Sequence, residues 1–530
     1  MATEQQTGGG GETEQPLGLT IASGAVAAAV IVPLLWLVKS ALEVGPEEAL
    51  ALLTRPQTVS VFLNSTVLVV LVTAACVALG VPLAYLTVRT DLPFKQFWTV
   101  AVSLPLVIPS YIGAFTFVSA FGPNGAFQRL LEPLGVQELP EIYGLPGAVL
   151  VLTLYTYPYV FITTRAALKS MDTTLIDAAR TLNHSRWEAF KWVTVPQIRP
   201  AVAAGALLAA LYALSDFGTP AIMRFDAFTR VIFVEFGTFG RDTATLLSLQ
   251  LVGVTLIILT LESQIRGNER TTTGGRSGSV MKLGRWRYPA VAFTGLVATV
   301  ALVVPLGILL TWLAEGVSTT GTSLDFRPVY AFNSMFVSGA AAVVATLAGV
   351  PVAYLAAHHS SRLSSLFERA TYIGYAVPGV VLGLALVFFG SSYATSIYQT
   401  VYLLVFAYVI RFLPQAVGSL RASFLRVDPA LPEAARTLGE TPTGAFRHVT
   451  LPLVAPGLFG GAALVFLTTM KELPATLMLR PSGFKTLVTH IWSAYGQGYF
   501  GRAVVPALIL LFVSGLSMLI IIRQEGYDVK

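Results

Sequence analysis

Charged residues and cysteine are scarce in this chain of 530 residues. Only 12% of the residues are Asp, Glu, Lys or Arg, whereas a soluble domain needs roughly 25% to cover its surface. With 54% hydrophobic residues and a mean hydropathy of +0.70, the composition predicts a polytopic membrane protein. The single cysteine, Cys76, excludes an internal disulfide and any cysteine-based metal cluster.

Motifs for phosphate and metal chemistry are also missing. No lysine follows a glycine, so the chain has no Gly-Lys-Ser/Thr loop to hold a phosphate, and it has no His-Glu-x-x-His motif. The neighbours His358 and His359 would diverge by ~100° on a helix and would share a metal poorly, so they indicate a cytosolic helix end. We therefore expect no catalytic residue, no bound metal and no cofactor on this chain, and no nucleic-acid partner.

Twelve apolar runs have the length, or nearly the length, needed to cross ~30 Å of hydrocarbon. Ten are residues 17–38, 61–88, 97–121, 145–163, 246–261, 288–313, 332–357, 370–389, 397–417 and 504–522, and two shorter runs begin at Ala201 and Gly457. The sequence thus predicts an all-α protein with six spans in each half. Residues 1–16, Gly-rich and acidic without a basic start or a cleavage site, are expected to form a retained, disordered tail.

Basic residues concentrate on one side when both termini are placed inside. That side carries 23 of the 34 Lys and Arg residues, and this count places Arg411 in a loop on the inside. Because basic loops stay in the cytoplasm, we expect a multi-pass protein of the cell membrane, surrounded by lipid, with both termini cytoplasmic.

The two halves are repeats of one another. Asn64 matches Asn333 and Pro109 matches Pro378 at an offset of 269 residues, and later pairs match at an offset of 256. Six crossings separate corresponding spans, so the repeats are parallel. We divide the chain into a first repeat (17–265), a polar linker (266–287) on the cytosolic side, a second repeat (288–523) and a C-terminal tail (524–530).

One polar motif occurs once in each half, between apolar runs. It reads Asp177-Ala178-Ala179-Arg180-Thr181-Leu182 with Pro196 and Pro200, and again Glu433-Ala434-Ala435-Arg436-Thr437-Leu438 with Pro452 and Pro456. The pattern predicts a helix, a tight turn and a second helix along the cytosolic surface. The alternative is a pair of interfacial connectors with only a packing role.

Capping residues define these two helices in both copies. Asp172 and Asp428 are placed to cap the first helix, and Asn183 and Gly439 suit a left-handed turn. Ser185 with Glu188 fits a capping box, and Thr441 is its counterpart in the second copy. We expect Phe190 and Phe446 to face the membrane, and Pro196 and Pro452 to end the second helix.

The second copy resembles the signature loop of permease subunits of ABC importers. The matching residues are Glu433, Ala434, Ala435, Gly439, Phe446, Leu451, Pro452 and Pro456. The first copy departs from it with Asp177 for Glu and Asn183 for Gly, which keep a carboxylate and a residue tolerant of positive φ. The resemblance covers nearly the whole chain as two fused units, and it implies the fold of a type I ABC importer permease with about twelve helices.

The same resemblance implies partners and roles. Two copies of an ATPase subunit, which bind ATP and Mg²⁺, would dock on residues 172–199 and 428–456, and an extracytoplasmic solute-binding protein would deliver the substrate. The residues implied in ATPase coupling are Asp177, Ala178, Ala179, Asn183, Phe190, Pro196, Glu433, Ala434, Ala435, Gly439, Phe446 and Pro452.

The fifth span of each half is short and ends at a carboxylate. The fourteen residues from Ala201, or from Gly457, rise only ~21 Å before Asp216 or Glu472. Either the helix breaks within the membrane, or these carboxylates face the protein interior at membrane depth. Both are candidates for the translocation path, the alternative being a polar cap at the outer helix end. Arg224 and Arg480 are placed to pair with them, or to remain as solvated charges.

The stretches after these spans indicate the substrate. Residues 215–220 and 471–477 resemble those of fused ferric-iron importer permeases, and related permeases for thiamine, polyamines or phosphonates share the architecture. Two other classes compete: a twelve-span secondary transporter driven by an ion gradient, and a membrane-embedded enzyme. The enzyme would need clustered His, Asp or Glu within the spans, and the sequence has no such cluster.

Overall fold

The computed structural model describes residues 17–122, 125–135, 138–172, 174, 179, 181–182, 185–238, 240–267, 280–314, 325–359 and 361–524. Apart from an isolated bridge between Thr90 and Met281, this part of the chain contains helices and no strand. Its shorter helices are α2 (Pro46–Leu53), α6 (Ala126–Leu131), α9 (Arg186–Ala189), α11 (Gly218–Ile222), α12 (Phe228–Gly237), α20 (Ala430–Thr437), α21 (Pro442–Ala445), α23 (Pro474–Leu479) and α24 (Leu487–Gly496).

Nine helices of the described chain are long and apolar enough to cross a membrane, and two bent pairs raise the number to eleven. The long elements are α1 (Leu17–Glu43), α3 (Pro56–Arg89), α7 (Leu145–Ser170), α10 (Val195–Ser215), α13 (Arg241–Gly267), α14 (Arg287–Ala298) with α15 (Val304–Ala314), α16 (Pro328–His358), α19 (Val401–Phe424) and α22 (Leu451–Met470). The twelfth predicted span coincides with α25 (Val504–Gln524). The predicted all-α polytopic class is confirmed.

The two bent pairs occupy matching places in the repeats. α4 (Lys95–Ser103), continued by the 3-10 turn η1 (Leu104–Val107), meets α5 (Ser110–Phe121) at 94°, and α17 (Arg362–Ala376) meets α18 (Gly379–Tyr393) at 104°. Pro109 and Pro378 stand at the bends. A proline forces the residue before it toward extended backbone, and Ile108 and Val377 have ψ of 122° and 121°. The repeated proline therefore positions the start of α5 and α18.

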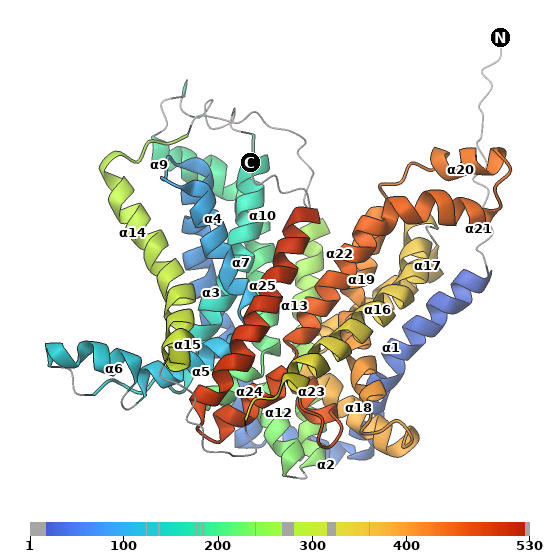
Figure 1. Ribbon diagram of the computed structural model, residues 1–530, viewed down its shortest axis with the longest axis horizontal. Helices are drawn as coiled ribbons and strands as arrows, with labels where there is room; N and C mark the ends of the chain where they lie inside the picture. Colours follow the sequence, from blue (N-terminus) through green and yellow to red (C-terminus); the bar gives the residue numbers. More distant parts are fainter. Residues whose placement is uncertain are drawn as a thin grey trace.

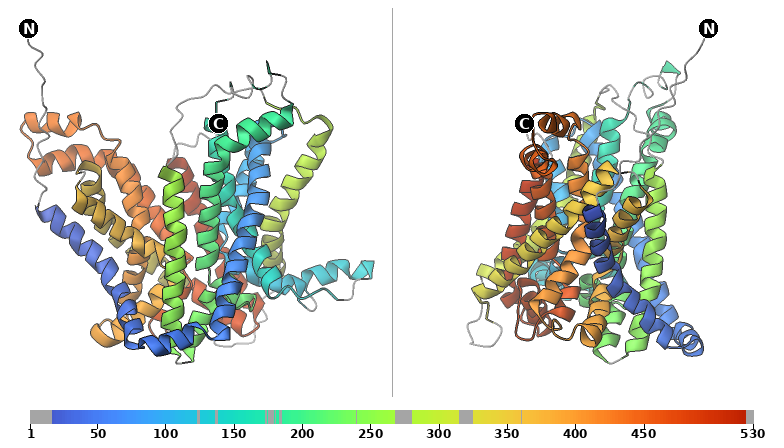
Figure 2. Two further views of the ribbon diagram at one scale, coloured as in Figure 1. Left: turned by 180° about the vertical axis from the view of Figure 1, so that it is seen from behind. Right: turned by 90° about the vertical axis from the view of Figure 1, so that its right-hand side faces the viewer.

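Each half is built around a bundle of three helices. α3, α7 and α10 pack against one another in the first half, and α16, α19 and α22 do so in the second. The first helix of each repeat is exchanged: α1 packs on α16, α17 and α18, whereas α14 packs on α4 and α15 on α5 (Figure 1). The second view of the molecule shows the same arrangement from behind (Figure 2). The halves are therefore interlocked.

The helices α12 and α24 are held by equivalent serines of the membrane helices. Ser65 Oγ accepts a hydrogen bond from the N–H of Phe228 at 2.9 Å, and Ser334 Oγ accepts one from the N–H of Leu487 at 2.8 Å. The serines are 269 residues apart, the offset of the first part of the repeat. Each hydroxyl satisfies one of the free N–H groups at a helix start.

The prediction that Pro196 and Pro452 end a helix is wrong. Each proline follows a π-helical turn, η3 (Phe190–Thr194) or η6 (Phe446–Thr450), and the helix continues through it. In these turns the N–H of the residue before the proline, Val195 or Leu451, donates to the carbonyl five residues back, and the wider turn accommodates the proline within a continuous helix.

This continuity also corrects the length of the fifth spans. They run over Trp187–Ser215 and Pro442–Met470, 29 residues each, which rise ~43 Å. They are long enough to cross a bilayer, and they break only at their ends, next to Asp216 and Glu472.

Candidate coupling helices and translocation cavity

The second copy of the motif forms the predicted helix, turn and helix. Asp428 Oδ1 accepts a hydrogen bond from the N–H of Ala430 at 3.0 Å at the start of α20. Gly439 has φ of +100°, the left-handed conformation that glycine adopts without strain. Thr441 Oγ1 then accepts from the N–H of Gly444 at 3.0 Å and caps α21.

The described part of the first copy shows the same caps. The N–H of Ser185 donates to Glu188 Oε2 at 2.7 Å and the N–H of Glu188 donates to Ser185 Oγ at 3.2 Å, which is the predicted capping box. The N–H of Thr174 donates to Asp172 Oδ1 at 2.9 Å and lowers the pKa of this carboxyl. Ala179 is buried. Asp177, Ala178 and Asn183 lie outside the described residues.

An aromatic pair joins each motif to a membrane helix. The ring of Phe190 lies 5.2 Å from that of Tyr85 on α3, and the ring of Phe446 lies 6.0 Å from that of Tyr354 on α16, both edge to face. The two tyrosines are repeat mates, as are the two phenylalanines. Each motif therefore contacts the equivalent membrane helix of its own half.

The motif of the second half presents an uncovered surface. α20 has no buried residue, and the side chain of Leu438 is 87% exposed. Glu433, Ala434 and Gly439 are exposed as well, and Ala435 is half-buried. α9 and α20 lie at the same end of the molecule, on opposite sides (Figure 1). The described residues at both positions include exposed apolar side chains, Leu182 and Trp187 in the first half and Leu438 in the second.

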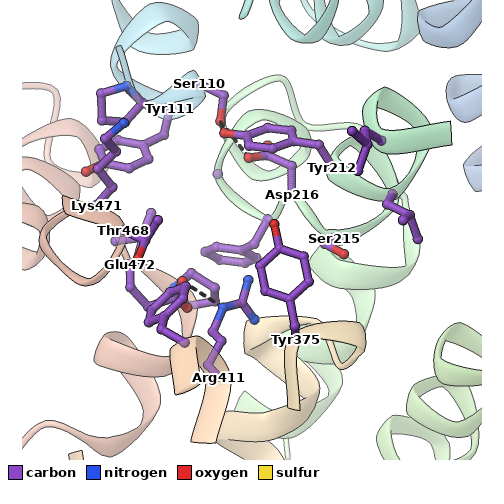
Figure 3. Close-up of a pocket in the computed structure, with 18 of the residues that line it drawn as sticks. Ser110, Tyr111, Tyr212, Ser215, Asp216, Tyr375, Arg411, Thr468, Lys471 and Glu472 are labelled. Atoms are coloured by element: carbon purple, nitrogen blue, oxygen red, sulfur yellow. Dashed lines mark hydrogen bonds and ion pairs between the residues drawn. The ribbon is translucent and has the colours of Figure 1, made fainter. Parts of the chain in front are cut away.

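A cavity of about 220 Å³ lies where the two halves meet (Figure 3). The ends of α10, α17 and α22, the starts of α5, α11 and α23, and parts of α7, α13 and α19 enclose it. The charged or hydrogen-bonding side chains that line it are Ser110, Tyr111, Tyr159, Tyr212, Ser215, Asp216, Thr255, Tyr375, Arg411, Gln415, Thr468, Lys471 and Glu472. Both predicted path carboxylates are therefore in one cavity.

Asp216 is held by hydrogen-bond donors of the first half. Ser110 Oγ donates to its Oδ1 at 2.5 Å, and the N–H of Thr219 donates to its Oδ2 at 2.8 Å. The hydroxyl of Tyr212 lies 3.4 Å from Ser110 Oγ and extends this network. Within the described chain no Lys or Arg forms an ion pair with Asp216. Hydrogen bonds thus orient the carboxyl group of Asp216, and no basic side chain of the described residues pairs with it.

Glu472 is paired, but with a residue that sequence reasoning placed elsewhere. Its Oε2 lies 3.2 Å from Nε of Arg411, and Arg411 also donates to the carbonyl of Val377 at 3.2 Å. The assignment of Arg411 to a cytosolic loop is wrong, because it stands inside α19. The signal was present: an arginine interrupts the apolar run 397–417.

The arginines considered as partners lie away from these carboxylates. The guanidinium of Arg224 covers the ring of Tyr143 at 4.6 Å, and Arg480 donates to the carbonyl of Phe484 at 3.2 Å. Lys471, which sequence reasoning did not single out, lines the cavity and donates to the carbonyl of Leu106 at 3.3 Å. In the portion of the chain that the structure describes, no group of three or more His, Cys, Asp or Glu is placed to hold a metal ion.

Two interlocked, apolar helical repeats that enclose a cavity between them have the architecture of a transport permease. The chain belongs to the family of binding-protein-dependent transport system inner membrane components, whose family model matches residues 76–320 and 349–523.

Three relatives extend this assignment. The chain is 30% identical to the Fe(3+)-transport system permease protein FbpB 2 of Haemophilus influenzae, over 96% of this chain and 98% of the relative. It is 26% identical to a probable ABC transporter permease protein, y4fN, of Sinorhizobium fredii, over 96% and 95%. It is 24% identical to the ferric transport system permease protein FbpB of Actinobacillus pleuropneumoniae, over 88% and 72%.

Proposed function

We propose that this chain is the permease subunit of an ATP-driven importer that moves ferric iron delivered by an extracytoplasmic binding protein. The relatives named as ferric permeases match it along most of its length and support this cargo. The energy for transport comes from ATP and Mg²⁺ bound by a partner ATPase. The protein is a multi-pass component of the cell membrane, where lipid surrounds its apolar helices.

The observation that carries the proposal is the repeated motif with an uncovered helix and an aromatic anchor. α20 exposes its surface, while Phe446 behind it contacts Tyr354 of α16. The first half repeats this anchor with Phe190 and Tyr85. Two such sites support the binding of two ATPase copies, one on each motif. They also support a cytoplasmic location for the end of the molecule that carries α9 and α20, and for both termini.

The coupling residues of this proposal are those of the two motifs. They are Asp177, Ala178, Ala179, Asn183, Phe190 and Pro196 in the first half, and Glu433, Ala434, Ala435, Gly439, Phe446 and Pro452 in the second. Asp216 and Glu472 line the proposed path. Closure of the ATPase pair would move the motifs together and open the cavity to the other side of the membrane.

The direct test is iron uptake by the purified permease, reconstituted in proteoliposomes with its ATPase and its binding protein. We expect uptake to require ATP and to survive an uncoupler. Uptake that continues without ATP and stops with an uncoupler would instead establish a secondary transporter.

The docking role is tested at Gly439. With φ of +100°, this position strains a β-branched residue, whereas asparagine, which the first copy carries as Asn183, tolerates it. We expect Gly439→Val to weaken ATPase retention on purification and to uncouple ATP hydrolysis from uptake, and Gly439→Asn to retain both. Wild-type assembly and uptake in Gly439→Val would refute the docking role.

A further inference from the structure

The cavity is asymmetric in charge, although repeated elements build it. Asp216 and Glu472 are repeat mates, but the residue before each differs: Ser215 in the first half and Lys471 in the second. The residue facing each carboxylate from the bent helix pair differs as well. Ser110 faces Asp216, whereas its mate Gly379 faces Glu472.

Gly379 explains why only Glu472 has a basic partner. A Cβ at this position would collide with Oε1 of Glu472 and Nη1 of Arg411, so the ion pair fits only against glycine. The repeat mate of Arg411 is Tyr155, which brings no positive charge to Asp216. As a result Arg411 neutralises Glu472, and Asp216 stays free to bind a cation.

The other side of the cavity offers unused donors. Lys471 has no carboxylate partner among the described residues and reaches only the carbonyl of Leu106. Tyr111 is 5% exposed, and its hydroxyl has no hydrogen-bond partner in the described protein. Both side chains line the cavity, away from Asp216 and Tyr212 (Figure 3). An ammonium and a free hydroxyl are the groups that bind an oxyanion.

The formal charges of the cavity cancel. Two carboxylates, Asp216 and Glu472, stand against Arg411 and Lys471. A bare trivalent cation would bring its whole charge into a chamber surrounded by apolar helices and hydrocarbon, where uncompensated charge is costly. A doubly or triply negative oxyanion at its side would remove most of that charge.

We propose that the cavity receives the ferric ion together with a small oxyanion, phosphate or carbonate, as one ion pair. Asp216, with the hydroxyls of Ser110 and Tyr212, faces the metal, since hard cations prefer oxygen ligands. Lys471 and Tyr111 face the oxyanion. The pair is cargo in transit and not a resident cofactor. The identity of the metal rests on the function proposed above.

The test uses the complete transporter in proteoliposomes, supplied with radioactive iron and either radioactive phosphate or radioactive bicarbonate. In the wild type we expect one of the two anions to enter with iron at a fixed ratio. Lys471→Met should lower anion and iron uptake together by about tenfold, the effect of losing a charge-assisted contact. Lys471→Arg should retain most of both.

Two further variants separate binding from folding. Tyr111→Phe removes only the hydroxyl and should also reduce anion uptake. Thr260→Val is the control, because Thr260 is not among the residues that line the cavity and its hydroxyl bonds the carbonyl of Leu256 in its own helix. ATP hydrolysis stimulated by the binding protein shows that each variant is assembled.

The outcomes distinguish this inference from the proposed function. Iron that enters without either anion, or anion and iron uptake that neither Lys471→Met nor Tyr111→Phe reduces, overturns the inference and leaves the iron permease standing. A wild-type transporter that moves no iron with either anion overturns the proposed function itself.

Discussion

Arg411 and Glu472 form an ion pair within the cavity, with Nε and Oε2 3.2 Å apart and the side chains 15% and 7% exposed. Loss of one partner leaves a buried charge without compensation, which costs about 3–5 kcal/mol. We expect Arg411→Met to lower the free energy of unfolding by this order, and the double variant Arg411→Met/Glu472→Gln to recover most of the loss. Denaturant unfolding of the purified permease in detergent measures both.

A more exposed pair provides the control for this measurement. Arg421 and Glu368 are 3.4 Å apart, with side chains 42% and 20% exposed. Such a pair contributes up to about 1 kcal/mol, so Arg421→Met should have a small effect. Equal losses in Arg411→Met and Arg421→Met would contradict the special cost of the cavity pair.

The serines that cap α12 and α24 allow the same prediction to be tested in both halves. Ser65→Ala and Ser334→Ala each remove one acceptor from a helix start, at a cost of about 1 kcal/mol. We expect hydrogen exchange to become about fivefold faster at the N–H of Phe228 in the first variant and at the N–H of Leu487 in the second.

Ser391 is the control for these caps, because its hydroxyl bonds only the carbonyl of Phe388 in its own helix. Ser391→Ala should leave the exchange of α12 and α24 unchanged. If hydrogen exchange is the same in the two cap variants and in the wild type, these hydrogen bonds do not stabilise the starts of α12 and α24.

The aromatic anchors of the motifs predict a coupling defect. Phe446→Ala and Phe190→Ala remove ring contacts with Tyr354 and Tyr85, each worth about 1 kcal/mol. We expect the amount of iron imported per ATP hydrolysed to fall several-fold in either variant, with ATP hydrolysis retained. Phe459 is 63% exposed on α22, and Phe459→Ala is the control with an expected normal ratio. Normal ratios in all three variants would argue against transmission through these rings.

His490 on α24 predicts a dependence of stability on pH. Its side chain is fully buried beside Tyr330, 5.0 Å between ring centroids, and burial, followed by the charge of Lys485, lowers the pKa of His490 to about 4. An unfolded histidine titrates near pH 6.5. Between these values the unfolded chain binds the additional proton, so the free energy of unfolding should fall as the pH drops from about 6.5 to 4.

The substitution for this test comes from the repeat itself. Val231 is the fourth residue of α12, as His490 is of α24, so His490→Val should fit and should flatten the pH dependence. His448 is exposed beside Glu440, and His448→Ala should leave the slope unchanged. Unfolding measured at several pH values in detergent decides this, and a slope that persists in His490→Val would assign it to another group.

The sequence by itself determined the features that depend on local chemistry. Low charge and long apolar runs identify the membrane class, because hydrocarbon admits few charged side chains. The capping pair Ser185 and Glu188 and the left-handed Gly439 follow from hydrogen bonds and dihedral angles within a few residues. The repeat and the two carboxylates that line the cavity were also readable from spacing alone.

Tertiary structure decided what depends on contacts far apart in the chain. The exchange of α1 and α14 between the halves, and the pairing of Arg411 with Glu472, join residues that no local pattern connects. Pro196 and Pro452 lie within continuous helices because a π turn precedes each, and this turn is anchored by packing against α3 and α16. Local sequence predicted helix ends at these prolines and placed Arg411 in a loop. Packing between distant segments overrides such local preferences.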